Sequence, residues 1–166
     1  DRQWRRRGPA KIPLASAAEE IHNYPANDPY GVPGGWVGLA DRLYQRAGID
    51  PGQLQFAQLY DDYPVMAFVQ MEGLGLCPAG RAHEFLRKTD ITTRGTLPIN
   101  TGGGQLSAGQ AGASGGMIGV YEAAAQLLGR AGERQLDCRL GLVSGYGMVA
   151  YGRGLCSSAA ILERVQ

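Results

Sequence analysis

Strand-like apolar runs alternate with segments of helical periodicity along most of the chain, and this alternation limits the folds that it can adopt. The runs that predict strands are 12–17, 54–60, 138–152 and 154–165. The segments that predict helices are 36–49, 63–76 and 117–132. Strands that alternate with helices favour parallel pairing, and the two adjacent runs at the end add one antiparallel pair. We therefore predict an α/β domain in which helices cover a mixed, mostly parallel sheet.

The segments between these elements are rich in polar and turn-forming residues. IHNYPANDPYGVPGG (21–35) predicts a long irregular loop, and 77–95 predicts a polar, hairpin-like connection. The helix over 36–49 is expected to end at Gly48, because glycine commonly closes a helix C-terminus. The whole chain, 1–166, has the length of a single domain. Its opening residues reach a strand-like run without a Met or a leader, so we expect a fragment or a processed chain.

Charge and cysteine content argue against several classes of function. The formal net charge is +1, whereas nucleic-acid-binding domains usually carry a clear basic excess. The apolar runs are far shorter than the roughly 20 residues that cross a membrane as a helix. The cysteines are Cys77, Cys138 and Cys156, too few and too widely spaced for a zinc site, and their odd number argues against a full disulfide framework. We expect a cytoplasmic protein without a metal site.

A glycine-rich stretch, TLPINTGGGQLSAGQAGASGG (96–116), lies between an extended segment and the expected helix over 117–132. Glycine lets another group approach the backbone closely, and N–H groups at a helix start favour an anion or an oxyanion. A phosphate-binding P-loop does not fit, because no Lys follows the last glycine, and a dinucleotide-binding fingerprint does not fit either. The alternative is a structural one, in which small residues allow tight packing of a helix.

Three segments carry a resemblance to a known family. QLYDDYPVMAFVQMEGLGLCPAG (58–80), LPINTGGGQLSAGQAGASGG (97–116) and LVSGYGMVAYG (142–152) resemble the C-terminal half of the thiolase superfamily, especially its lipid-transfer branch. The similarity runs from about Ala10 to Glu163. It implies one half of a duplicated fold, with a five-stranded mixed sheet, helices and an active site between the halves. It also implies an N-terminal half outside this chain, a homodimer and a small OB-fold partner protein.

The residues that carry thiolase chemistry are replaced in this chain. Gln110 stands where the family has its catalytic His, in a loop that looks one residue shorter, and an amide cannot act as a general base. Val143 takes the place of the second catalytic cysteine. Tyr60, followed by Asp61, matches the first polar residue of a further family motif. Cys156 lies downstream and is expected to be a small buried residue rather than a displaced catalytic thiol.

Members of the superfamily that lack the cysteines resemble retro-aldolases, which cleave β-hydroxyacyl-CoA thioesters as in steroid degradation. Tyr146 is expected in the loop that joins the last two strands, where it supplies acid–base chemistry if neighbouring groups lower its pKa from about 10. Tyr60, Asp61 and Gln110 complete the candidate catalytic set. The residues expected to bind the substrate are Asn100, Gly103, Gly104, Ser114 and Gly145. Backbone N–H groups of the glycine stretch would stabilise the enolate of the thioester.

Each of these assignments has an alternative. Tyr60 and Tyr146 suit packing at strand ends, and Asp61 suits the N-cap of the helix that follows. At the level of function, an aldolase acting on a coenzyme A thioester is the leading hypothesis. The alternatives are a non-catalytic acyl- or lipid-binding relative and a true acetyl-CoA acyltransferase whose essential residues are misplaced near Gln110. No covalently bound cofactor is expected in any of the three.

Overall fold

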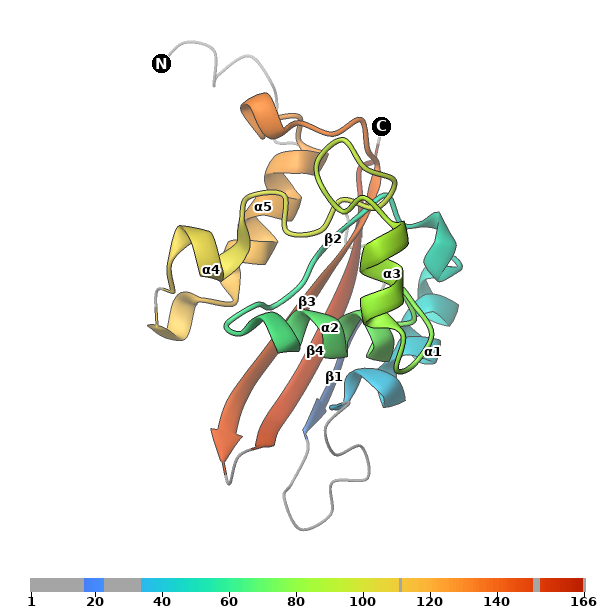
Figure 1. The fold of residues 1–166 in the computed structure, drawn as a ribbon, viewed down its shortest axis with the longest axis vertical. Coiled ribbons are helices and arrows are strands. Elements are labelled where there is room, and N and C mark those ends of the chain that lie inside the picture. The colour runs from blue at the N-terminus through green and yellow to red at the C-terminus, as the bar shows by residue number, and fades with distance from the viewer. Residues whose placement is uncertain (1–16, 23–33, 111, 151–152, 166) are drawn as a thin grey trace.

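A computed structural model describes residues 17–22, 34–110, 112–150 and 153–165 of the chain (Figure 1). The strands of the described residues are β1 (Ala17–His22), β2 (Phe56–Gln58), β3 (Leu140–Ala150) and β4 (Arg153–Glu163). The helices are α1 (Trp36–Ala47), α2 (Pro64–Gly73), α3 (Ala82–Lys88), α4 (Gly104–Ala108) and α5 (Met117–Leu127). Short 3-10 turns are η1 (Pro51–Gln53), η2 (Gly112–Ser114) and η3 (Gly132–Arg134). The predicted α/β class is confirmed.

The four strands form one mixed sheet in the order β1-β4-β3-β2. β4 pairs antiparallel with both β1 and β3, and only β2 pairs parallel, with β3. The mixed sheet is as predicted, but the expectation of mostly parallel strands is wrong. Local periodicity cannot reveal that β1 pairs with the far end of the chain. A fifth strand is not formed by the described residues, where Ile99 makes only an isolated parallel bridge to Ala57.

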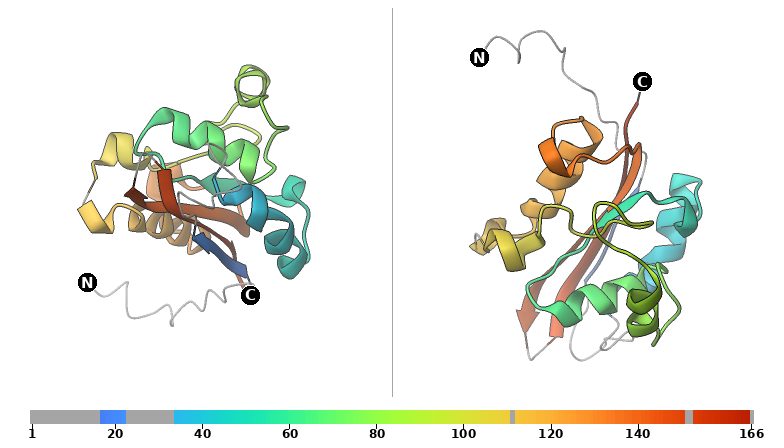
Figure 2. Two further views of the ribbon diagram at one scale, coloured as in Figure 1. Left: turned by 90° about the horizontal axis from the view of Figure 1, so that it is seen from below. Right: turned by 45° about the horizontal axis from the view of Figure 1, so that its top comes forward.

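Helices cover both faces of this sheet, with α1 and α2 on one side and α5 on the other (Figure 2). Side chains of a strand alternate between the two faces, so neighbours in β3 enter different cores. Leu142 packs with Trp36 and Leu43 of α1, whereas Val143 packs with Leu127 of α5. α1 ends where predicted, because Gly48 adopts a left-handed conformation with φ 66° and donates to carbonyls of the last turn.

Two connections differ from the predictions. The predicted hairpin-like segment 77–95 contains the helix α3, whose first residue is buried and donates its N–H to the carboxylate of Glu72 at 2.9 Å. Ala82, Phe85 and Leu86 have helical spacing, but the helix is only seven residues long and lies among polar and turn-forming residues, so the sequence analysis missed it. Of the strand predicted over 12–17, only Ala17 lies within the described residues, as the first residue of β1.

Close packing between β2 and β3 gives a test of the fold. Gly141 of β3 faces the fully buried ring of Phe56, and an added Cβ would overlap that ring. We predict that Gly141→Ala lowers the free energy of unfolding by about 1–3 kcal/mol, measured by urea denaturation. Gly52→Ala is the matched control, since nothing lies within 4 Å of a Cβ at Gly52. Equal stability of the two variants would contradict the packing.

Candidate active site

Two tyrosines from different elements come together at one edge of β3. Tyr60 lies two residues beyond the end of β2, and its ring centroid lies 6.1 Å from that of Tyr146. Tyr146 is not in the loop that was predicted for it but inside β3, paired with Ser157 of β4. Its ring also lies 5.5 Å from Trp36, so it sits between the apolar core and Tyr60. Because β2 pairs with β3 only as far as Val143, the chain leaves the sheet there and turns Tyr60 towards Tyr146.

The side chain of Gln70, on α2, holds Tyr60 in this position. Its Oε1 accepts hydrogen bonds from the N–H of Tyr60 at 3.1 Å and the hydroxyl of Ser144 at 2.5 Å. Its Nε2 donates to the carbonyl oxygens of Tyr60 and Met66, both at 2.6 Å. Gln70 is fully buried, and all four hydrogen-bonding positions of its amide are used. The sequence analysis missed this residue, whose only signal was a glutamine within the apolar run AFVQM.

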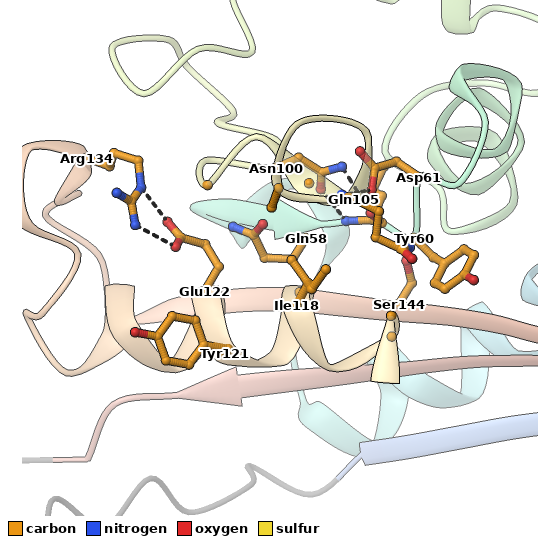
Figure 3. Close-up of a pocket in the computed structure, with 17 residues that line it drawn as sticks. Gln58, Tyr60, Asp61, Asn100, Gln105, Ile118, Tyr121, Glu122, Arg134 and Ser144 are labelled. Atoms are coloured by element: carbon orange, nitrogen blue, oxygen red, sulfur yellow. Dashed lines mark hydrogen bonds and ion pairs between the residues drawn. The ribbon is translucent and has the colours of Figure 1, made fainter. Parts of the chain in front are cut away.

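Asp61 and Asn100 position the glycine stretch. The carboxylate of Asp61 is buried and accepts the N–H of Gln105 at 2.7 Å (Figure 3). Asn100 accepts the N–H of Leu59 at 2.7 Å and donates to the carbonyl of the same residue at 3.0 Å. Gly104 is required beside Asp61, because an added Cβ would overlap the carboxylate. The side chain of Asn100 and one carboxylate oxygen of Asp61 are therefore bonded to backbone groups.

Much of the hydrogen bonding within the glycine stretch is internal. The N–H of Gly103 donates to the carbonyl of Asn100 at 2.7 Å, and the N–H of Gly109 donates to Gln105 at 2.9 Å. The N–H of Gly115 donates to Gly112 at 3.0 Å. These backbone donors are not available to an enolate. The expectation that the glycine stretch supplies such donors therefore fails for these three residues.

The other predicted site residues fall in different environments. Gln110 is exposed, and its Nε2 lies 3.4 Å from the hydroxyl oxygen of Tyr60, at the outer limit of a hydrogen bond. Gly145 lies in β3, where a Cβ would approach the hydroxyl of Ser158 to 2.5 Å. Ser114 is exposed in η2 and lines neither of the two cavities that surround the tyrosines.

These two cavities meet at Tyr60. The loop cavity, ≈ 210 Å³, lies against the glycine stretch and α5, and the sheet cavity, ≈ 790 Å³, lies along β3 and β4. The loop cavity is lined by polar side chains that include Gln58, Asp61, Asn100, Gln105 and Glu122. The sheet cavity is lined mainly by small and apolar residues that include Val120, Val143, Tyr146, Ala160 and Leu162. Both cavities share Tyr60, Gly116 and Ser144.

A buried carboxylate ties the glycine stretch to α5. Glu122 accepts hydrogen bonds from Thr101 at 2.8 Å and from Gln126 at 3.0 Å. It also accepts one from Arg134 at 3.0 Å (Figure 3). Burial disfavours its charged form, but these hydrogen bonds and the charge of Arg134 outweigh burial and lower the pKa of the carboxyl below its ordinary value. Glu122 is therefore a structural anion, satisfied by its neighbours.

Two of the three cysteines, Cys77 and Cys138, are buried. Burial raises the pKa of the Cys138 thiol to about 11 and also raises that of Cys77. Cys156 is half-buried and lines the sheet cavity.

Among the described residues, no three His, Cys, Asp or Glu side chains gather closely enough to hold a metal ion. Within the same ranges, none of the helices has the length and apolar character to cross a membrane.

Comparison with known proteins gives concordant matches. The family described as "Thiolase C-terminal domain-like" matches residues 32–164. The chain is 42% identical over 94 residues to the 17-hydroxy-3-oxo-4-pregnene-20-carboxyl-CoA lyase of Mycobacterium tuberculosis, over 56% of this chain and 24% of that protein. It is 31% identical over 128 residues to sterol carrier protein 2 of Gallus gallus, over 73% of this chain and 23% of that protein.

Among solved structures, the chain is similar to one titled "Ltp2-ChsH2(DUF35) aldolase", with a TM-score of 0.69 and 26% sequence identity. That match covers 89% of this chain and 38% of the other. The chain therefore spans about a quarter of the length of the curated relatives that it matches.

The buried carboxylate predicts a pH-dependent contribution to stability. Because folding lowers the pKa of Glu122 from 4.5, its stabilising effect is present above about pH 4.5 and is lost as the pH falls towards the lower folded-state value. We predict that Glu122→Gln reduces the unfolding free energy by about 2 kcal/mol at pH 7, and that this difference shrinks below pH 4.5. Denaturation at several pH values measures it, with the exposed Glu133→Gln as control. A difference that is constant with pH would contradict the assignment.

Proposed function

Because this chain belongs to the thiolase C-terminal domain-like family, we propose that it carries the acid–base groups of a retro-aldolase that cleaves β-hydroxyacyl-CoA thioesters. The observation that carries this proposal is the pair formed by Tyr60 and Tyr146, whose ring centroids are 6.1 Å apart where two cavities meet. The chain has Val143 and Gln110 where the resemblance places the catalytic cysteine and histidine of thiolases. The two phenols lie near these replaced residues, since Tyr60 lies beside Gln110 and Tyr146 lines the sheet cavity together with Val143.

The proposed reaction needs one base and one acid. Tyr60, as a phenolate, takes the proton of the β-hydroxyl group, and a carbonyl forms at that carbon. The bond between the α and β carbons breaks, and its electron pair passes into the thioester as an enolate. Tyr146 then gives its proton to the α carbon, which completes the thioester product. The side-chain amide of Gln110, whose Nε2 lies 3.4 Å from the Tyr60 hydroxyl oxygen, faces the group that takes this proton.

The cavities suggest how the substrate lies. The sheet cavity, ≈ 790 Å³, is large enough for a bulky apolar group, and its walls are mainly small and apolar. We assign to it the side of the substrate that leaves as an aldehyde or ketone, a steroid or lipid skeleton. The lyase from Mycobacterium tuberculosis, whose name contains a pregnene carboxyl-CoA, supports this class of substrate. The thioester then points towards the loop cavity, with coenzyme A as part of the substrate.

Partner proteins belong to the same proposal. Apolar side chains are exposed around α4 and α5, where Leu106 is 56%, Met117 60% and Tyr121 73% exposed. Exposed apolar side chains gathered on neighbouring elements suit a surface that another domain covers. We propose that an N-terminal thiolase half covers it, in a homodimer. We also propose that a small OB-fold protein binds this assembly as a separate partner. The aldolase structure whose title names two proteins supports this proposal. We propose a cytoplasmic location.

A non-catalytic lipid-binding role is the second candidate. It is favoured by the similarity to sterol carrier protein 2, which extends over 73% of this chain. In that case the sheet cavity would hold an acyl chain or sterol, and the two tyrosines would only line it. Turnover separates the two roles, because a binding protein releases no aldehyde or ketone.

Conservative substitution of the tyrosines tests the proposed chemistry. We predict that Tyr60→Phe and Tyr146→Phe each lower kcat for cleavage of a β-hydroxyacyl-CoA at least about 100-fold, because general acid–base catalysis contributes about 10² to 10⁴. Binding of the thioester should change little. Tyr63→Phe is the matched control, since Tyr63 is 65% exposed. Wild-type turnover in both site variants would refute the tyrosine mechanism.

The acyltransferase alternative depends on a thiol. Cys156 lies opposite Gly147 in the β3–β4 pair and lines the sheet cavity. We predict that Cys156→Ala keeps cleavage within about twofold of wild type, since the retro-aldol steps use no thiol. Mass spectrometry of the protein after incubation with acyl-CoA provides the second readout. An acyl adduct on Cys156, with activity lost in the alanine variant, would favour the acyltransferase.

A further inference from the structure

Gln105 has a buried side-chain amide that lacks hydrogen-bond partners. The residue is 5% exposed, and neither its Nε2 nor its Oε1 has a partner among the residues that the structure describes. In this part of the chain, the only other buried side-chain atom in that state is one carboxylate oxygen of Asp62. Leaving a buried amide unpaired is costly, and native proteins contain few such groups, so this one calls for an explanation such as a bound ligand.

The position of this amide is fixed from two sides. The backbone N–H of Gln105 donates to the buried carboxylate of Asp61 at 2.7 Å, which anchors the first turn of α4. The side chain lies against Gly115, where an added Cβ would come within 2.5 Å of Oε1. Gln105 lines the loop cavity together with Tyr60 and Ser144 (Figure 3). The lack of a side chain at Gly115 leaves the space that the amide occupies.

Several other polar groups around the loop cavity are already engaged in hydrogen bonds. The side-chain amide of Asn100 is bonded to the backbone of Leu59, and that of Gln58 donates to Thr101 at 2.9 Å. The N–H groups of Gly103 and Gly115 donate within the glycine stretch. The carboxamide of Gln105 is thus the buried side-chain amide of the loop cavity for which the described residues provide no hydrogen-bond partner.

We propose that the carboxamide of Gln105 binds the carbonyl oxygen of the substrate thioester and stabilises the enolate that forms there. This inference rests on the proposed aldol cleavage. As the bond between the α and β carbons breaks, negative charge moves onto the thioester oxygen. An N–H held in a site shielded from water stabilises that charge more than it stabilises the neutral carbonyl. The role is specific to this chain's Gln105 and does not use the backbone donors of the glycine stretch.

Gln105→Leu removes the donor while keeping a similar size. In the full-length native protein with its partner subunits, kcat should fall about 100-fold, as for loss of one oxyanion donor, with KM changed less than about threefold. The midpoint of thermal unfolding should stay equal or rise, because an apolar group replaces an unpaired amide. Gln45→Leu, at an exposed position of α1, is the matched control. A clear fall in the midpoint with unchanged kcat would overturn the inference in favour of a structural role.

Gly115→Ala provides a second variant that leaves Gln105 in place but displaces its amide. Its kcat should fall as in Gln105→Leu, and the double variant should show little further loss, because both changes remove the same interaction. Full additivity of the two losses would contradict a shared cause.

Binding of two coenzyme A derivatives separates this inference from the proposed reaction. Calorimetry with acetyl-CoA and with S-ethyl-CoA, which lacks the carbonyl, should show at least about a tenfold preference for the thioester in wild type and none in Gln105→Leu. If the wild type cleaves no β-hydroxyacyl-CoA but shows this preference, the aldolase proposal fails, and only the binding of the thioester carbonyl by Gln105 stands. If the wild type cleaves the substrate and the leucine variant matches it in kcat and in preference, the role of Gln105 fails and the aldolase stands. A wild type without preference overturns the role of Gln105 in either case.

Discussion

The buried amide of Gln70 is the interaction on which the candidate site depends. It connects α2, which carries it, with Tyr60 in the segment after β2 and with Ser144 of β3. Two acceptor positions and two donor positions are all used, on Tyr60, Met66 and Ser144. In the interior of a protein, each of those backbone and hydroxyl groups would be costly to leave unpaired. The amide therefore fixes how far Tyr60 lies from β3, and with it the distance to Tyr146.

A second set of buried polar groups holds the glycine stretch over the same site. Asp61 accepts a hydrogen bond from the first turn of α4, and Asn100 accepts one from the backbone N–H of Leu59. Thr101 donates to Glu122 of α5. Glycine is needed here for space, since a side chain at Gly104 would overlap Asp61. The stretch is thus fastened to β2 on one side and to α5 on the other. What it leaves beside Tyr60 is a small polar cavity with an unpaired amide in its wall.

How much of this was predictable follows from the range of the interactions. The ends of local elements could be predicted, as at Gly48, whose left-handed conformation closes α1. The resemblance indicated Tyr60 and Tyr146 as separate candidates, but it did not predict that their rings lie 6.1 Å apart, and their catalytic roles stay predictions. The order of the strands could not be predicted, because the antiparallel partner of β1 is β4, at the other end of the chain. The sequence analysis missed Gln70 and Gln105, because an uncharged amide has no distinguishing pattern in a sequence until its neighbours in space are known.

The central claim is that cleavage depends on two tyrosines held in place by Gln70. The most direct test is the turnover of Gln70→Met, a variant of similar size that lacks the amide. The turnover is expressed per amount of folded protein, which circular dichroism measures. Gln45→Met is the control. Both tyrosines remain in this variant, but the amide that positions Tyr60 is gone. We therefore expect kcat for a β-hydroxyacyl-CoA to fall about 100-fold or more, because small displacements of reacting groups have effects of this size. Wild-type turnover in the folded Gln70→Met protein would contradict the account.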